Sequence, residues 1–357
     1  MSANYSRRRL LQRGGLVGAV LVAGCSGDGT DDRTQDTATL PGGGDSTATT
    51  ATTETGTETE GDATDATTET EDGGTDTETR TPGDYPYADW IPAPASTVDG
   101  TVNFELWYVD AAAIRSMKAS LQDGLLSSQS GKFPGDEHTP QHVEPGQVND
   151  SIRIRTPWRD GSESGAAAHV YLGTFDEQSA VDAYLNEGWA SGPTEYEGVT
   201  IIENNETGNA IGVSDSVVIA VFDPEGADLL ETFVDARAGA VARAHEVDAK
   251  VARLFEIVQA DTFVRVTYGT VYVSGSTNSL PEGALGTGIG WRVGDQETEK
   301  VFAFPFTDEA RASAAADSED FLPTEIGGFE VTESVDGDFV VGRQTVPTGE
   351  LERFPEF

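Results

Sequence analysis

The sequence predicts an α+β fold of antiparallel sheets with helices packed on one face, preceded by a long disordered tether. Three observations predict it. A Thr-, Asp- and Glu-rich segment extends to residue 84 with almost no large apolar side chains. Beyond it, four apolar strands each run into an Asp or Thr and then into a segment of helical period. A β-α-β-β-α-β order occurs twice, which predicts two tandem ferredoxin-like units, residues 85–213 and 214–357.

Residues 1–24 have the features of an export signal. Arg7 and Arg8 supply positive charge, and the apolar run that follows is only about ten residues long, half of what a membrane span needs. The pattern therefore indicates a cleaved signal rather than a permanent transmembrane helix. Cys25 directly follows a Val-Ala-Gly triplet, a position typical of lipid attachment. The alternative is an ordinary small residue in a signal that is cut elsewhere.

Residues 25–84 are predicted to be a disordered tether, because Thr, Asp, Glu, Gly, Ala and Ser cannot bury enough apolar surface to offset the entropy of ordering. A flexible chain of this length reaches on the order of 40 Å. Its threonines are compatible with O-glycosylation and equally with a bare acidic spacer.

The charge balance excludes some function classes. The chain has 22 Lys plus Arg against 62 Asp plus Glu, a formal net charge of -40, and this repels nucleic acid and anionic membrane surfaces. Such acidity is typical of halophilic proteins, since molar salt shortens the Debye length to about 3 Å. An acidic calcium-binding surface protein is the alternative, but the sequence has no Asp-x-Asp-x-Asp-Gly loop. The single cysteine excludes an intramolecular disulfide.

The segment Ser6-Arg7-Arg8-Arg9-Leu10-Leu11, the apolar run and Cys25 together resemble a twin-arginine export signal that ends in a lipobox. Leu10 departs from that pattern, which most often has Phe there. With the acidic tether and domain, the chain resembles the uncharacterised surface lipoproteins of halophilic archaea. The resemblance implies export, lipid on Cys25 and attachment to the outer face of the cell membrane. It implies no activity.

The predicted strand-to-helix junctions share one local chemistry. In each, an apolar strand precedes a residue that can cap a helix N-terminus. The predicted strands are 104–109, 170–175, 217–222 and 301–306, and the predicted caps are Asp110, Asp176, Asp223 and Thr307. Gly-flanked hairpins are expected at 198–213 and 328–342. A long helix is expected from residue 227 to about 259, with a break near Gly239.

One polar cluster could hold a metal. Glu137, His138 and His142 provide a carboxylate and two imidazoles four residues apart, ligand types that zinc accepts. Nearby prolines and glycines indicate a loop, so a solvated connection is the main interpretation. A metal-dependent or hydrolytic extracytoplasmic enzyme is the alternative. Because the sequence has no Gly-x-Ser-x-Gly motif and its only cysteine is assigned to the anchor, a non-enzymatic binding or envelope role without a cofactor is preferred.

The best binding-site prediction is a pair of arginines. Arg153 and Arg155 alternate on one face of a strand near Trp158, in a chain with few cations. Guanidinium forks match carboxylates, so the pair could hold a sugar acid or another small acidic ligand, with Trp107, Tyr108 and Tyr171 as walls. The alternative is ion pairing with acids of a neighbouring strand. A surface protein or a glycan is the other class of partner expected.

Two further sequence features are local. Asn149 and Asn205 begin N-glycosylation sequons in predicted loops. The glycine-rich stretch 283–290 lacks the Lys-Ser/Thr of a P-loop and leads into strand-like residues. Close strand packing or a turn explains these glycines better than phosphate binding.

Overall fold

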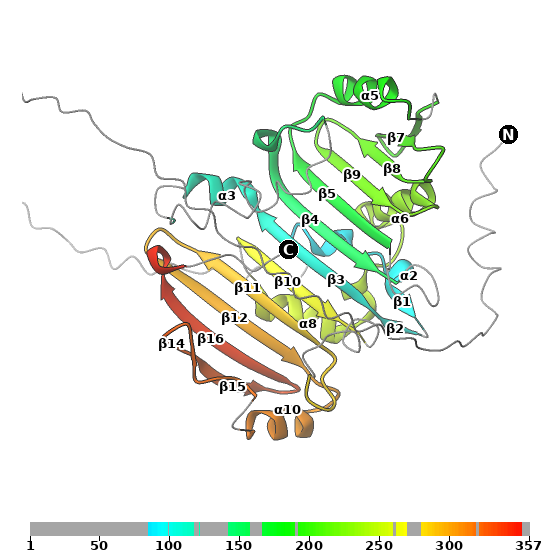
Figure 1. The fold of residues 1–357 in the computed structure, drawn as a ribbon. Helices are drawn as coiled ribbons and strands as arrows, with labels where there is room; N and C mark the ends of the chain where they lie inside the picture. Colours follow the sequence, from blue (N-terminus) through cyan, green and yellow to red (C-terminus); the bar gives the residue numbers. More distant parts are fainter. Residues whose placement is uncertain are drawn as a thin grey trace, which may run out of the picture. The chain divides into compact units, whose positions relative to one another are not determined.

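The computed structural model describes residues 85–98, 100–117, 121, 142–157, 166–189, 192–259, 262–269, 280–318 and 321–351. Within them, twelve strands form one antiparallel sheet (Figure 1). From edge to edge the sheet consists of β15 (Thr332–Asp336), β16 (Phe339–Pro347), β12 (Glu297–Pro305), β11 (Gly286–Val293), β10 (Phe263–Tyr268), β3 (Phe104–Asp110), β4 (Val148–Thr156), β5 (Ala166–Gly173), β9 (Val217–Phe222), β8 (Ala210–Val213), β7 (Val199–Glu203) and β6 (Thr194–Tyr196).

Shorter elements flank this sheet. Two small hairpins pair β1 (Thr97–Val98) with β2 (Thr101–Val102) and β13 (Glu325–Ile326) with β14 (Phe329–Glu330). The helices are α2 (Ala93–Ser96), α3 (Ala111–Ser116), α5 (Glu177–Asn186), α6 (Gly226–Ala238), α7 (Ala244–Val247), α8 (Ala249–Val258) and α10 (Glu309–Ala316). The 3-10 turns are η2 (Ala88–Trp90), η4 (Pro145–Gln147) and η5 (Thr348–Glu350). In the part of the chain just defined, every helix is too short or too polar to cross a membrane.

The α+β class is confirmed, but two separate ferredoxin-like units are not. β3 of the first predicted unit pairs with β10 of the second, which makes the sheet continuous. β9, which was expected to open the second unit, lies between β5 and β8 of the first. The predicted boundary at 213/214 therefore falls between two neighbouring strands of one sheet.

The strand order nevertheless repeats on the two sides of the β3–β10 pair. Reading outward, one half begins with β3, β4, β5, β9 and β8 and continues with β7 and β6, and the other has β10, β11, β12, β16 and β15. In both halves a helix follows the third strand, α5 in the first and α10 in the second. In the sequence, the first half ends at β9 and the second begins at β10. The β5–α5 and β12–α10 junctions occupy equivalent places in the two halves. The other two predicted junctions, β3–α3 and the one after β9, are similar to these only locally.

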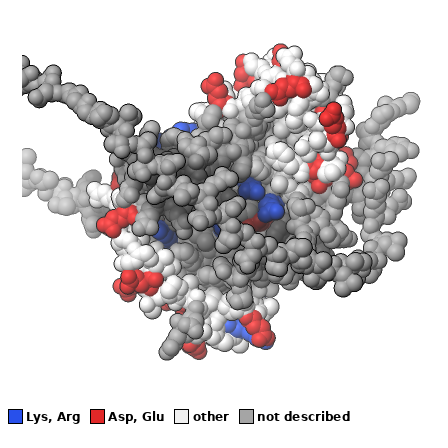
Figure 2. All heavy atoms as spheres, viewed as in Figure 1, with Lys and Arg blue, Asp and Glu red and all other residues white. Residues whose placement is uncertain are grey.

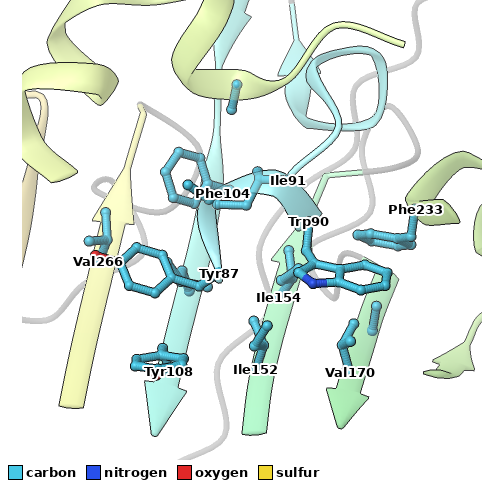
Figure 3. Close-up of a cluster of buried hydrophobic side chains, with 14 of the residues drawn as sticks. Tyr87, Trp90, Ile91, Phe104, Tyr108, Ile152, Ile154, Val170, Phe233 and Val266 are labelled. Carbon is cyan, nitrogen blue, oxygen red and sulfur yellow. The ribbon is translucent and has the colours of Figure 1, made fainter. Parts of the chain in front are cut away.

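One face of the sheet is covered and apolar. α6 packs on β7, β8 and β9, and α8 packs on β11 and β12. Between these helices and the strands lies the N-terminal part of the domain, where Tyr87 and Ile91 are fully buried and Trp90 is almost so (Figure 3). The Phe255 ring contacts both Tyr87 and Phe104 there. The segment that follows the predicted tether is therefore part of the main core.

Helix ends match the predicted chemistry in most places. The side chain of Asp110 accepts from the Ala113 amide at 2.7 Å, as predicted for a cap. Asp176 accepts from Ser179 at 3.0 Å in the same way. The predicted break is confirmed, since α6 ends at Ala238 and Gly239 adopts the left-handed conformation with φ 73°.

Two predicted caps are wrong by one or two residues. At α10 the cap is Asp308 rather than Thr307, because the Asp308 side chain accepts from the Arg311 amide at 2.9 Å. Asp223 accepts from the amide of Glu225 at 2.8 Å and so closes a turn, and α6 begins only at Gly226. A carboxylate can therefore order the chain before a helix without capping it.

The predicted close packing of the glycine-rich stretch is found at Gly288. A Cβ at this position would lie 2.7 Å from side-chain carbons of Leu254 and Val258 on α8. The absence of a side chain lets α8 approach β11 closely.

The opposite face is covered by helices at its two ends, so the prediction that helices pack on one face of the sheet is wrong. α5 packs on β7 and β8 and α10 on β15 and β16, and the two helices lie at the top and bottom of Figure 1. Between these ends, α3 packs on β4, and Ile114 of α3 belongs to a buried apolar cluster with Trp107 and Phe263. β4, β3 and β10 also present charged side chains on this face, and the candidate site lies beside this cluster.

Candidate functional site

The strand register brings three long side chains together in one row. Arg153 on β4 lies opposite Trp107 on β3, and Trp107 lies opposite Arg265 on β10. Opposed residues in adjacent strands point to the same side of a sheet. The guanidinium carbons of Arg153 and Arg265 lie 4.8 and 5.3 Å from the centre of the Trp107 ring, within cation–π range.

A second row adds one carboxylate and a third guanidinium. Glu105 on β3 lies opposite Arg155 on β4, and Arg155 Nη1 is 3.2 Å from Glu105 Oε2. The other oxygen of Glu105 lies 3.6 Å from Arg265 Nη2. We call Arg153, Arg155, Arg265, Trp107 and Glu105 the arginine band.

The band carries an excess of positive charge. Three guanidiniums face one carboxylate, which leaves two positive charges uncompensated by the described residues of the band. The whole chain has a formal charge of -40, so a local excess of this sign is unusual for it. In Figure 2, Lys and Arg side chains lie near the middle of the visible face, whereas Asp and Glu side chains lie mostly toward its rim.

Arg153 is the least compensated member of the band. Burial lowers the pKa of this arginine, the neighbouring Arg155 charge lowers it further, and Glu105 opposes both. Its Nε is buried and has no hydrogen-bond acceptor among the residues described, and the same holds for Nε1 of Trp107. Buried donors of this kind are normally satisfied, and these two come from opposed residues of adjacent strands, so we consider them as donors to a ligand.

The outer neighbours of the band are aromatic. His169 on β5 lies opposite Arg153, and its ring contacts Tyr171 and Phe222. Phe222 is 49% exposed. Of the three predicted walls, Trp107 is in the band and Tyr171 is buried beside it, but Tyr108 points to the covered face, where its hydroxyl donates to Asp150 at 2.8 Å.

The predicted sites have different outcomes. Arg153 and Arg155 do share one face, and Arg155 makes the ion pair with a neighbouring strand that was the alternative interpretation. Six of the predicted site residues lie outside the described residues: Trp158, Glu137, His138, Cys25, Arg7 and Arg8.

Of the predicted metal ligands, His142 is described, and its Nε2 lies 2.9 Å from Glu187 while its ring contacts Tyr184. The described residues contain no group of three or more His, Cys, Asp or Glu placed to hold a metal.

Both sequon asparagines are exposed. Asn205 lies in the loop between β7 and β8, where the Asn204 side chain orders the turn by accepting from the amides of Glu206 and Thr207. Asn149 was predicted in a loop but lies within β4, at an irregularity in the pairing with β5. Glycosylation of either residue remains a prediction.

Two surface cavities lie away from the band. One of about 610 Å³ is lined by residues that include Trp90, Asn149 and Arg237, and one of about 450 Å³ lies beside α10 and includes Arg311. The cation in each is already paired: Arg237 with Asp89 at 3.3 Å, and Arg311 with Glu282 at 2.7 Å. The band differs because its cations outnumber its carboxylate.

Glu105 and Arg265 were not predicted from the sequence. A single arginine in the apolar strand Phe263–Tyr268 was a signal for Arg265, because a charged residue between buried strand neighbours needs a partner. Nothing local indicated that β10 would lie beside β3. This pairing creates the band.

No protein-family model matches the chain, and no curated protein matches it in sequence. Among solved structures, crystal form III of TP0453 is similar with a TM-score of 0.43 and 9% identity, covering 74% of this chain and 96% of that chain. Crystal form I gives 0.40 and 10%, covering 73% and 95%. Crystal form IV gives 0.37 and 10%, covering 72% and 93%. At these values we base no conclusion about fold or function on the likeness.

Proposed function

We propose that this chain is a lipid-anchored cell-surface protein of a halophile, whose α+β domain binds a carboxylate-bearing ligand without catalysis. The signal with Arg7 and Arg8 would direct export, and lipid on Cys25 would hold the protein on the outer face of the cell membrane. The acidic segment up to residue 84 would act as the tether. These assignments are supported by the sequence pattern and by the excess of acidic residues.

The ligand-binding part is carried by one observation, the uncompensated positive charge of the arginine band. Guanidinium groups bind carboxylates through two parallel hydrogen bonds, and such charge-assisted contacts persist when salt screens longer-range attraction. A ligand carboxylate at Arg153 would supply the charge and the acceptor that the described residues of the band lack.

We also propose that the domain arose by duplication of a half-domain of five strands with a helix after the third. The shared strand order on the two sides of the β3–β10 pair supports this. Each half then contributes to the band, with Arg153 from one and Arg265 from the other.

Binding can be measured by titrating the purified full-length chain with D-glucuronate and with succinate in molar potassium chloride. We expect saturable binding that Arg153→Gln weakens roughly tenfold to a hundredfold, the size of a lost charge-assisted contact. The matched control is Arg292→Gln, since Arg292 lies in the same sheet and pairs with Glu299 at 3.1 Å. Absence of binding by both probes would overturn the proposed ligand class.

The anchor has a separate test. Cys25→Ser should release the protein into the medium or leave an unprocessed precursor, because no lipid can then be attached. Cell fractionation measures this, and unchanged retention in the membrane fraction would contradict the anchor.

A further inference from the structure

The charge and spacing of the arginine band define the ligand more narrowly. We propose that the band binds a small dicarboxylate, with one carboxylate at Arg153 and the other at Arg265, on the two sides of Trp107. This inference rests on the proposed function, because it assumes that the band binds a carboxylate.

The first step is the charge count. Both oxygens of Glu105 are used within the band, one by Arg155 and one by Arg265. Arg153 makes no ion pair with any described residue, and burial and the neighbouring Arg155 lower its pKa. Partly buried, uncompensated cations are costly, so the excess of two charges fits a dianion better than a monoanion.

The second step is the position of the unsatisfied donors. Nε of Arg153 and Nε1 of Trp107 come from opposed residues in adjacent strands, and both lack an acceptor among the described residues. Trp107 therefore offers its ring to two guanidiniums and its N–H to a ligand. We expect one carboxylate of the ligand to accept from both of these buried donors.

The third step is the distance between the two cations. Arg153 and Arg265 come from the strands on either side of β3, and strands two apart in a sheet are separated by roughly 10 Å. The guanidinium carbons of the two arginines lie 4.8 and 5.3 Å from the centre of the Trp107 ring, so each is a separate point of attachment for an anion. Two carboxylates joined by a short carbon chain can reach both, and the Trp107 side chain lies between them.

The test compares matched ligands. Malonate, succinate and glutarate are titrated into the full-length chain, and the tightest binder is compared with its own monoamide, which keeps the length and loses one charge. We expect the dicarboxylate to bind roughly tenfold to a hundredfold more tightly than the monoamide. Arg265→Gln should remove most of this difference while changing the affinity for the monoamide little.

The controls separate binding from folding. Arg292→Gln should leave both affinities unchanged, and Arg265→Lys, which keeps the charge, should retain part of the preference if Arg265→Gln folds poorly. Equal affinities of the dicarboxylate and its monoamide for the wild-type chain, with binding still dependent on Arg153, would overturn this inference alone. Failure of every carboxylate probe, including D-glucuronate, would overturn the proposed function as well.

Discussion

Two clusters in this molecule each hold one carboxylate between two arginines, and they differ in what surrounds them. On the covered side, Asp89 lies 2.8 Å from Arg243 and 3.3 Å from Arg237. On the opposite face, Glu105 lies between Arg155 and Arg265 at 3.2 and 3.6 Å. The two carboxylate side chains are almost equally buried, 14% and 12% exposed.

The two clusters differ in net charge. Glu246 lies 3.6 Å from Arg243, so the Asp89 cluster has two acids for two arginines. The Glu105 cluster instead has a third arginine, Arg153, stacked on Trp107. Similar pairwise distances thus serve two purposes. A balanced cluster ties the N-terminal segment to the core, whereas an unbalanced cluster has capacity for a ligand.

The largest loss of stability should come from a substitution in the core on the covered face. Phe104 is fully buried against Phe255 and Tyr268, so Phe104→Ala should lower the free energy of unfolding by about 3–5 kcal/mol. Phe222 lies on the opposite face and is half exposed, so Phe222→Ala should change the free energy of unfolding by less than about 0.5 kcal/mol. Denaturant titration in molar salt measures both. Similar losses would mean that Phe222 contributes to the core as much as Phe104 does.

Breaking the balanced cluster should have the next largest effect. Asp89→Asn leaves Arg237 and Arg243 without their shared carboxylate, and we expect a loss of about 2 kcal/mol in unfolding free energy. Glu246→Gln is the matched control, since this more distant and more exposed acid should contribute less than about 1 kcal/mol. A dicarboxylate should not restore the stability of Asp89→Asn.

Breaking the unbalanced cluster should lower the free energy of unfolding by less, and added ligand should reduce the loss. Glu105→Gln removes the band's own carboxylate, and we expect a loss of about 1 kcal/mol. Added dicarboxylate should recover much of it, because the ligand can pair with the arginines that Glu105 leaves. Thermal unfolding with and without succinate measures the recovery, and its absence would make the two clusters equivalent.

The smallest effect concerns α5 and α10, the helices at the two ends of the face that carries the band. Backbone hydrogen bonds from Ser179 and Arg311 lower the pKa values of the caps Asp176 and Asp308 below their usual 3.8. A carboxyl group whose pKa is lower in the folded state stabilises it above the usual pKa, and this contribution is lost as pH falls through the folded-state value. The thermal unfolding midpoint should therefore decrease as the pH is lowered from about 5 to about 3.

The control for this pH effect is Asp176→Asn with Asp308→Asn, because asparagine can still cap a helix but does not titrate. The doubly substituted chain should show a smaller decrease of the unfolding midpoint in acid. An unchanged decrease would assign the acid sensitivity to other carboxylates.

Much of the local structure could be predicted from the sequence because it depends on near neighbours. The caps at Asp110 and Asp176 and the break at Gly239 follow from short-range hydrogen bonding and backbone conformation. The common face of Arg153 and Arg155 follows from the two-residue period of a strand.

The sheet order and half of the site could not be predicted, because they depend on pairing between distant segments. The β3–β10 pair joins residues more than 150 positions apart, and it alone brings Arg265 to Trp107 and Glu105. The local similarity of four strand-to-helix junctions also gave no sign that β8 and β9, on the two sides of the predicted boundary, pair in one sheet.

The most direct measurement is the increase in unfolding free energy that succinate produces in the wild-type chain and in Arg153→Gln. A ligand that binds only the folded state adds about 2.7 kcal/mol at a hundred times its dissociation constant. We predict an increase of this kind for the wild type and little or none for Arg153→Gln, with unliganded stabilities within about 1 kcal/mol of each other. Equal increases in both chains, or none in either, would contradict the account of the arginine band as a binding site.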